Sequence, residues 1–145
     1  MSSLPPDTRL LLIDDHQIYL DGLSLTLGSL CEGVKLDHAR NAAEALQLVR
    51  EYPYDLILLD LQLPDSSGLS LMQKLRAADA MVPIAILSAS NSPSDLEAAL
   101  QLGAAGFISK TTDGKTLLDA VTQLLYGAQV VIGDTALKID RQTSA

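Results

Sequence analysis

Three carboxylates at the ends of two apolar runs are the residues of this chain best suited to chemistry. Asp14 and Asp15 follow the run Leu10–Ile13, and Asp60 follows Leu56–Leu59. If both runs are parallel strands of one sheet, the carboxylates meet at its carboxyl edge, where open α/β sheets bind ligands. Clustered carboxylates repel one another unless a cation neutralises them, and their oxygens are suitable ligands for a hard cation such as Mg²⁺.

A hydroxyl group and an ammonium group end two later apolar runs. Ser88 follows Ile84–Leu87, and Lys110 follows the run from Gly106 to Ser109. A hydroxyl and an ammonium beside the carboxylates and a cation suit a phosphoryl group. Taken singly, a serine after a strand is most often a turn residue, so the interpretation depends on the whole set.

These groups must be positioned by a sheet, and the chain alternates short apolar runs with segments of helical periodicity. This alternation predicts an α/β fold, a doubly wound (βα)5 sheet of the flavodoxin-like kind with five parallel strands in the order 2-1-3-4-5. A weaker strand at Val34–Ala39 contains two charged residues and is expected at an edge. The expected helices are Gln17–Leu30, one ending at about Glu51, Leu69–Ala78, Pro93–Leu102 and Gly114–Tyr126.

Two local expectations concern helix packing and helix ends. Asn41 and Glu44 form a predicted capping box, in which each side chain accepts from the other's backbone N–H. Gly103 is expected to end its helix in the left-handed conformation. The inward face of the first helix is expected to contain Ile18, Gly22, Leu25 and Ser29.

Composition limits the class of protein. The chain has 145 residues, 48% of them hydrophobic, and a formal net charge of -8. Such an acidic chain should be repelled by nucleic acid and anionic membranes, and it has no apolar run long enough to cross a bilayer. The single cysteine, Cys31, excludes an internal disulfide. We therefore expect a cytoplasmic protein with a flexible N-terminus at 1–8, one domain at 9–128, and a tail or linker at 129–145.

Four segments, in order, resemble a known family. They are Leu11–His16, Asp55–Asp60 with Pro64 and Gly68 following, Leu87–Ala89, and Gly103–Lys110. From about residue 9 to 127, the chain resembles the receiver (REC, CheY-like) domain of a two-component response regulator. His16 after the acidic pair and Thr111 after the lysine resemble the NarL/FixJ (LuxR-type) subgroup.

The resemblance implies a role for each site residue. Asp60 would be the phosphoacceptor, which attacks the phosphorus of a phosphohistidine and becomes an acyl phosphate. Lys110 and Ser88 would hold the phosphoryl oxygens. The implied Mg²⁺ ligands are Asp15, Asp60 and the backbone carbonyl of Gln62, with Asp14 acting mainly through water.

Further roles are implied around this centre. Phe107 would be a switch aromatic that moves inward when Ser88 is drawn to the phosphate, although a partly buried strand aromatic is an equal alternative. Gln62 and Ser90 would flank the attacking water and set the lifetime of the acyl phosphate. Thr111 replaces a proline that many receivers have, so its loop should be held differently. His16 has no second imidazole or cysteine at ligand spacing, so no transition-metal site is expected.

The implied function is a phosphorylation-controlled switch rather than a turnover enzyme, with self-phosphorylation and self-dephosphorylation only. Its partner would be a sensor histidine kinase, and a phosphorylation-dependent homodimer is compatible with it. The charge would shift the surface formed by residues 93–102, 106–109 and 114–126. Output would be transcriptional, through a helix-turn-helix domain outside this chain; the chain itself would bind neither nucleic acid nor membrane.

Three other functions are supported by the sequence to different degrees. An aspartate-nucleophile phosphohydrolase is disfavoured, because such enzymes carry a second aspartate two residues after the nucleophile and this chain has Gln62 there. A receiver-like interaction module that works without phosphorylation is also compatible with the sequence. Nucleotide binding is disfavoured, since neither glycine-rich phosphate-binding motif is present.

Overall fold

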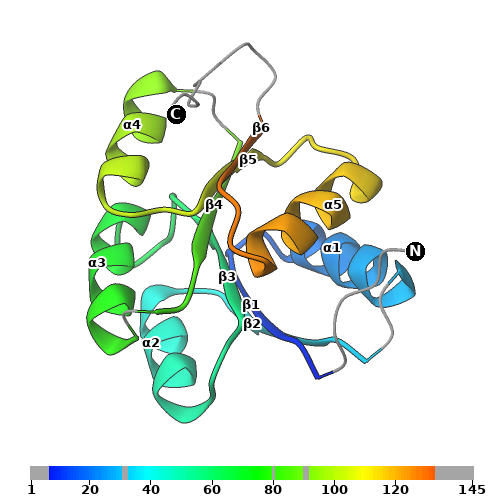
Figure 1. The fold of residues 1–145 in the computed structure, drawn as a ribbon. Helices are drawn as coiled ribbons and strands as arrows, with labels where there is room; N and C mark the ends of the chain where they lie inside the picture. Colours follow the sequence, from blue (N-terminus) through cyan, green and yellow to red (C-terminus); the bar gives the residue numbers. More distant parts are fainter. Residues whose placement is uncertain (1–6, 31–32, 80, 90–91, 133–145) are drawn as a thin grey trace.

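A computed structural model describes residues 7–30, 33–79, 81–89 and 92–132, with only the backbone described at 29 and 30. Within these ranges, strands and helices alternate along the chain and the strands form one parallel sheet (Figure 1). The strands are β1 (Arg9–Ile13), β2 (Lys35–Ala39), β3 (Leu56–Asp60), β4 (Ile84–Ser88), β5 (Gly106–Ser109) and β6 (Val130–Ile132). The helices are α1 (Gln17–Leu30), α2 (Ala42–Glu51), α3 (Gly68–Ala78), α4 (Pro93–Gln101) and α5 (Gly114–Leu125).

The strand order is β2-β1-β3-β4-β5-β6, which contains the predicted order and adds one strand. All five residues of β3 and of β4 are buried, as expected for strands covered on both faces. Lys35 at the start of β2 is exposed, and β2 is an edge strand as predicted.

The prediction of five strands was wrong, because Val130–Ile132 pairs in parallel with β5. The Val130 N–H donates to the Ala105 carbonyl at 3.0 Å, and the Val130 side chain is 8% exposed within the core. Gly106 permits this pairing, since a Cβ there would lie 2.9 Å from the Val130 carbonyl oxygen. The segment expected to be a tail or linker therefore begins with a strand, while residues 133–145, like 1–6, lie outside the described part.

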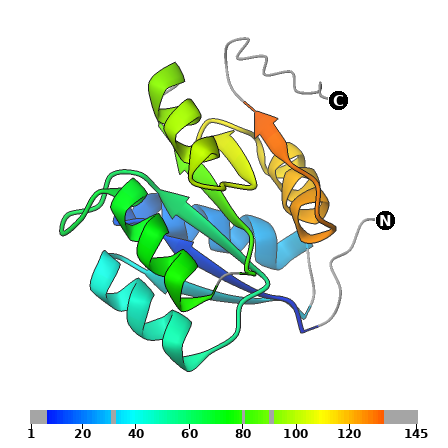
Figure 2. The same ribbon diagram turned by 60° about the vertical axis from the view of Figure 1, so that its left-hand side comes forward.

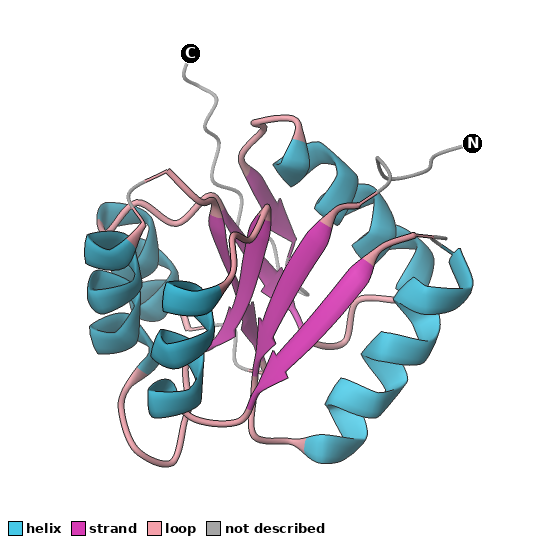
Figure 3. Cartoon of the chain, turned by 90° about the horizontal axis from the view of Figure 1, so that it is seen from below, coloured by secondary structure: helices cyan, strands magenta, loops and turns pink. Residues whose placement is uncertain are grey.

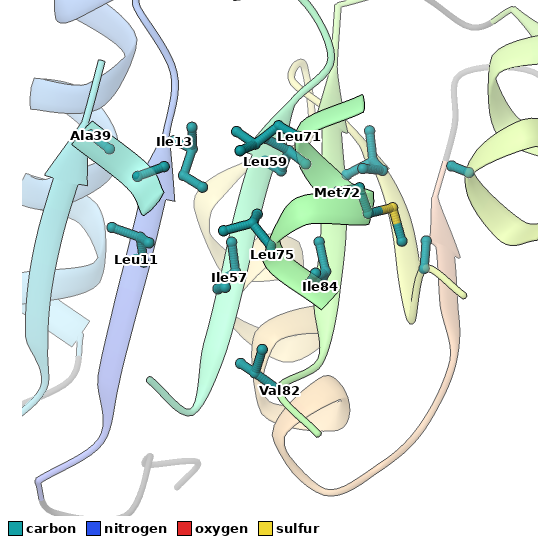
Figure 4. Packing of buried hydrophobic residues seen from close by; sticks show 14 of the residues in the cluster. Leu11, Ile13, Ala39, Ile57, Leu59, Leu71, Met72, Leu75, Val82 and Ile84 are labelled. Atoms are coloured by element: carbon teal, nitrogen blue, oxygen red, sulfur yellow. The ribbon is translucent and has the colours of Figure 1, made fainter. Parts of the chain in front are cut away.

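Helices cover both faces of the sheet, so the molecule has three layers (Figures 1 and 3). Helices α1 and α5 lie on one face of the sheet and α2, α3 and α4 on the other (Figure 2). The first pair shares one core cluster with β1, β3, β4 and β5, and the other three helices share a second cluster. In the second cluster, Leu71 and Leu75 of α3 pack over Leu59 and Ile57 of β3, and Met72 of the same helix points toward β4 (Figure 4). Among the described helices, none is both long and apolar enough to cross a membrane.

The expected inward face of α1 was wrong. Ile18 is 89% exposed and Leu25 is 74% exposed, whereas the buried residues of the helix are Leu20, Leu23 and Leu27. Both sets have helical spacing, so periodicity alone does not choose between them. Gly22 is also exposed, and the side chain of Ser29 lies outside the description.

The helix ends follow the sequence with one difference. The Asn41 side chain accepts from the Glu44 N–H at 2.8 Å, which confirms the N-cap of α2. The Glu44 carboxylate, however, accepts from the Arg40 N–H at 2.8 Å instead of from Asn41. The reciprocal half of the capping box was therefore wrong by one residue. Gly103 has φ +95° after α4, as predicted.

Candidate phosphoryl and metal site

The neighbouring strands β1 and β3 bring Asp14 and Asp60 to one edge of the sheet. Ile13 of β1 pairs with Leu59 of β3, so the residue after each lies at the same level. Both carboxylates are buried, with Asp14 2% exposed and Asp60 4% exposed. The topology thus produces the carboxylate pair that the sequence predicted.

Lys110 lies between these two carboxylates. Its Nζ is 2.6 Å from Asp14 Oδ2 and 3.2 Å from Asp60 Oδ2, and its side chain is only 9% exposed. The Lys110 N–H donates to the Ser88 carbonyl at 2.9 Å, which anchors the residue to the end of β4. Asp14 Oδ2 is in ion-pair contact with the ammonium but receives no hydrogen bond of good geometry among the described residues.

The Asp60 carboxyl group has a raised pKa. Burial is the main cause, because it penalises the charged form, and the Asp14 carboxylate adds to it. The Gln62 N–H, which donates to Asp60 Oδ1 at 3.1 Å, and the Lys110 ammonium act in the opposite direction. Added positive charge at this site therefore favours the ionised form that a nucleophile needs.

His16 belongs to the site, although the sequence analysis gave it no role there. Its Nδ1 lies 2.8 Å from Asp14 Oδ1, 3.5 Å from Asp15 Oδ1 and 3.7 Å from Asp60 Oδ2. Its backbone N–H also donates to Asp14 Oδ1 at 2.9 Å, and its carbonyl accepts the Leu20 N–H at the start of α1. Asp14 therefore fixes the entry to the helix as well as lining the site.

Tyr19, in the first turn of α1, is a second residue that the sequence analysis missed. The Lys110 Nζ lies 4.8 Å from the centre of its ring, within cation–π range. Burial and the nearby Asp14 and Asp60 carboxylates raise the pKa of Tyr19 to about 12, so the ring is neutral. An aromatic residue just beyond an acidic pair was the available signal.

The remaining predicted residues lie around this centre. Ser88 is the last residue of β4 and is buried. Phe107 in β5 is 1% exposed, so it is fully rather than partly buried. Gln62 is exposed beside the site and forms an isolated bridge with Ser67. Ser90 lies outside the described residues.

Two loops that border the site are held by side chains. The Ser109 Oγ accepts from the Thr111 N–H at 3.2 Å and lies 2.7 Å from Thr111 Oγ1, a backbone bond that a proline there cannot make. In the loop after β3, Asp65 accepts from the N–H groups of Ala42 and Ala43 at 2.8 and 3.2 Å. These bonds, mainly the one from Ala42, lower the pKa of Asp65.

The donor set is suitable for a divalent cation. Asp14, Asp15, His16 and Asp60 each offer a ligand atom, and these atoms lie within 4.8 Å of one another. Asp15 is exposed, and it borders an open hollow of about 440 Å³ with Arg40 and Pro64 on its rim. The site is thus buried on the sheet side and accessible from solvent.

Comparisons with known proteins agree with this geometry. The family model for the response regulator receiver domain matches residues 10–122. The nitrate/nitrite response regulator NarL of Escherichia coli K12 is 34% identical over 131 residues, which are 90% of this chain and 60% of NarL. The chain therefore spans less than two thirds of that relative's length.

Solved structures show the same fold. A LuxR-family two-component response regulator from Aurantimonas has a TM-score of 0.78 at 28% identity, covering 84% of this chain and 87% of that one. A Burkholderia pseudomallei response regulator with a phosphorylated aspartic acid and a calcium ion has a TM-score of 0.73 at 28% identity, covering 83% and 69%. The chain belongs to the response regulator receiver domains, the phosphorylation-controlled signalling switches of two-component systems.

Proposed function

We propose that Asp60 is the phosphoacceptor of this receiver and that Lys110 and Ser88 hold the transferred phosphoryl group. The observation that supports this most is the position of the Lys110 ammonium, 3.2 Å from Asp60 Oδ2 and 2.6 Å from Asp14 Oδ2. A buried carboxylate with a fixed cation beside it can accept a phosphoryl group whose new charge is already partly neutralised.

In the transfer step an Asp60 oxygen forms a bond to phosphorus as the bond from phosphorus to the donor's imidazole nitrogen breaks. The ammonium of Lys110 and the hydroxyl of Ser88 bind the phosphoryl oxygens. The Gln62 N–H, already bonded to Asp60 Oδ1, orients the carboxylate. Hydrolysis of the acyl phosphate by water resets the switch, with Gln62 and Ser90 flanking that water and setting its rate.

Mg²⁺ is the proposed cofactor. Asp15, Asp60 and the backbone carbonyl of Gln62 would hold it directly and Asp14 through water; when bound, it supplies positive charge to the phosphoryl oxygens. The cluster of ligand atoms within 4.8 Å supports this assignment. The phosphorylated aspartic acid and calcium ion of the Burkholderia protein support the same pairing of chemistry and cation.

The proposal extends to partners and output. The phosphodonor would be a sensor histidine kinase, in a cytoplasmic setting, and the added charge would move Phe107 and alter the surface of α4, β5 and α5. Transcriptional output through a DNA-binding domain, with or without a homodimer, is proposed from relatives such as the transcriptional regulatory protein DltR of Streptococcus agalactiae. Between phosphorylation and hydrolysis the domain acts as a switch and turns over no other substrate.

The test is the intact mass of the protein after incubation with acetyl phosphate and Mg²⁺. The wild type and Asp119→Asn, an exposed aspartate on α5, should each gain one phosphoryl group, and Asp60→Asn should gain none. Omitting Mg²⁺ should prevent the gain. A wild type that neither gains mass nor releases phosphate would instead be an interaction module that works without phosphorylation.

A further inference from the structure

The Lys110 ammonium has an aromatic partner, the ring of Tyr19, in addition to the polar groups of the site. Its Nζ lies over that ring, 4.8 Å from the ring centre, and a cation within roughly 6 Å of the centre is attracted by an aromatic face. The same Nζ is 2.6 Å from Asp14 Oδ2, 3.2 Å from Asp60 Oδ2 and 3.2 Å from His16 Nδ1. The ammonium therefore contacts the acidic groups and an aromatic face at the same time.

Separate backbone attachments bring the ammonium and the ring together. The Lys110 N–H donates to the Ser88 carbonyl at 2.9 Å, at the end of β4. The His16 carbonyl accepts the Leu20 N–H at 3.0 Å in the first turn of α1, beside Tyr19. The Tyr19 ring itself packs against the core cluster that α1 shares with α5. The contact therefore joins two segments that backbone hydrogen bonds hold in place.

A lysine needs such partners because its flexible stem and strongly hydrated ammonium do not fix its position. The Lys110 side chain is only 9% exposed, so little water competes for the ammonium. A carboxylate is a strong partner, but its own negative charge offsets the positive charge. An aromatic ring attracts the ammonium without adding a net charge. The positive charge of Lys110 thus stays available to oxygens at Asp60.

The Tyr19 ring stays neutral in these acidic surroundings. Burial is the main reason why the pKa of Tyr19 is raised to about 12, and the Asp14 and Asp60 carboxylates add to the shift. A phenolate here would repel an incoming phosphoryl group, and at neutral pH the raised pKa prevents its formation. The face of the ring, which a phenylalanine would share, is therefore the part that acts on Lys110.

We propose that Tyr19 is a positioning residue whose ring face holds the Lys110 ammonium beside Asp60 for phosphoryl transfer. The inference rests on the proposed function and adds a residue that acts through Lys110 rather than on the phosphoryl group itself. Electrostatic stabilisation is strongest when the stabilising charge is in place before the new charge develops. Without the ring, the ammonium can turn toward solvent or wholly toward Asp14, and transfer to Asp60 slows.

The first measurement is NMR of the full chain with ¹³C-labelled lysine. The ring current of an aromatic face shifts nearby nuclei upfield, so the Lys110 Cε group should give an upfield signal, identified by its loss in Lys110→Met. The shift should persist in Tyr19→Phe and disappear in Tyr19→Leu. The matched control is Tyr52→Leu, which removes a similar contact with Arg9, 4.7 Å from the ring centre at the start of β1, and should leave the Lys110 signal unchanged.

The second measurement is the rate of phosphorylation by acetyl phosphate with Mg²⁺, followed by intact mass at a temperature where every variant is folded. Tyr19→Leu should react roughly tenfold more slowly than wild type, the loss expected for a largely desolvated cation–π contact. Tyr19→Phe and Tyr52→Leu should react at the wild-type rate. The rate and the Lys110 signal should change in the same variant, which a purely structural role of Tyr19 does not require.

A Lys110 signal that is not shifted upfield in wild type, or that is unchanged in Tyr19→Leu, would overturn the proposal. Equal phosphorylation rates in wild type and Tyr19→Leu would also overturn it. So would a Tyr19→Phe variant as slow as Tyr19→Leu, because the effect would then belong to the hydroxyl. Failure of the proposed function is seen separately, as a wild type with the shifted signal that gains no phosphoryl group on Asp60; the ring would then position Lys110 without serving transfer.

Discussion

The Asp60 carboxylate is buried and lies 3.2 Å from one ammonium group, that of Lys110. Its pKa is raised, chiefly by burial. A group whose pKa is higher in the folded state contributes stability that is present below its unfolded pKa and lost as pH rises through the folded value. Ionised Asp60 therefore destabilises the metal-free domain at neutral pH.

We predict that Asp60→Asn raises the melting temperature of the metal-free domain at pH 7 by a few degrees. The difference from wild type should shrink as pH is lowered from 7 and wild-type Asp60 becomes protonated. Thermal unfolding in chelator across this pH range measures it. Asp119→Asn should show no such trend, and a difference between Asp60→Asn and wild type that is constant with pH would contradict the assigned cause.

The Lys110 ammonium offsets the negative charge of the two buried carboxylates, Asp14 and Asp60. Replacing it by methionine keeps the length of the side chain and removes the charge, which should cost about 3 kcal/mol of unfolding free energy without metal. Mg²⁺ should restore more stability to Lys110→Met than to wild type, because it replaces the missing charge. Denaturant unfolding with and without Mg²⁺ checks this, with Lys115→Met, an exposed lysine on α5, as control.

The carboxylates and Lys110 were predictable at this scale, because each follows an apolar strand and strand ends meet at one edge of a parallel sheet. His16 and Tyr19 were not. Their inclusion depends on how the chain leaves β1 and enters α1, and that geometry is set by the Asp14 side chain accepting the His16 N–H. A side chain's direction across a turn has no periodic signal in the sequence.

Among the elements, the loop after β3 is tied to α2 by Asp65. Its carboxylate accepts from the N–H groups of Ala42 and Ala43, which carry the partial positive charge of the N-terminus of α2. The bonds lower the Asp65 pKa, so their contribution to stability is present above its unfolded pKa and lost as pH falls. This loop also contains the carbonyl of Gln62 that is proposed to bind Mg²⁺.

Asp65→Ala should therefore lower both stability and metal affinity. We expect a melting temperature lower by a few degrees at pH 7 and Mg²⁺ binding that is several-fold weaker, because Gln62 loses its fixed position. Calorimetric titration with Mg²⁺ measures the second effect. Asp79→Ala removes an aspartate at the far end of α3 and should leave Mg²⁺ affinity unchanged; an equal loss in both variants would contradict the role of the loop.

Helix α1 shows why periodicity can identify an element and still misplace its face. The set of Ile18 and Leu25 and the set of Leu20 and Leu27 both recur at seven residues, yet only the second is buried. Asp21 lies on the same side of the helix as Ile18 and Leu25, and a charged residue there indicates the exposed side. The other helices combine polar and apolar faces more clearly, and their bounds were predicted to within about a residue.

For the molecule as a whole, the strand that sequence analysis missed completes one side of the sheet. β6 has three residues, too few for an alternating pattern to be recognised. Its position depends on distant partners, since Val130 pairs with Gly106 and packs with residues of α5. Such pairings between segments far apart in sequence are determined by the tertiary structure and not by local propensity.

Val130→Ala should remove roughly 1–2 kcal/mol of unfolding free energy, because the side chain is almost fully buried in the core shared with α5. Ala128→Gly, at an exposed position just before the strand, is the control for changes in the connection. Chemical denaturation measures both. Hydrogen exchange at the Val130 amide, which donates to Ala105, should quicken in Val130→Ala; unchanged exchange and stability would mean that the strand is not integral to the fold.

The pairing of β6 with β5 also determines what other polypeptides can do at this side of the molecule. An uncovered edge strand is a template to which a foreign strand can add. Here the outer backbone groups of β5 are already used, so a partner can extend the sheet at β5 only by first displacing Val130–Ile132. Because β6 has only three residues, a partner strand could displace it. The strand that β6 covers, β5, leads directly to Lys110.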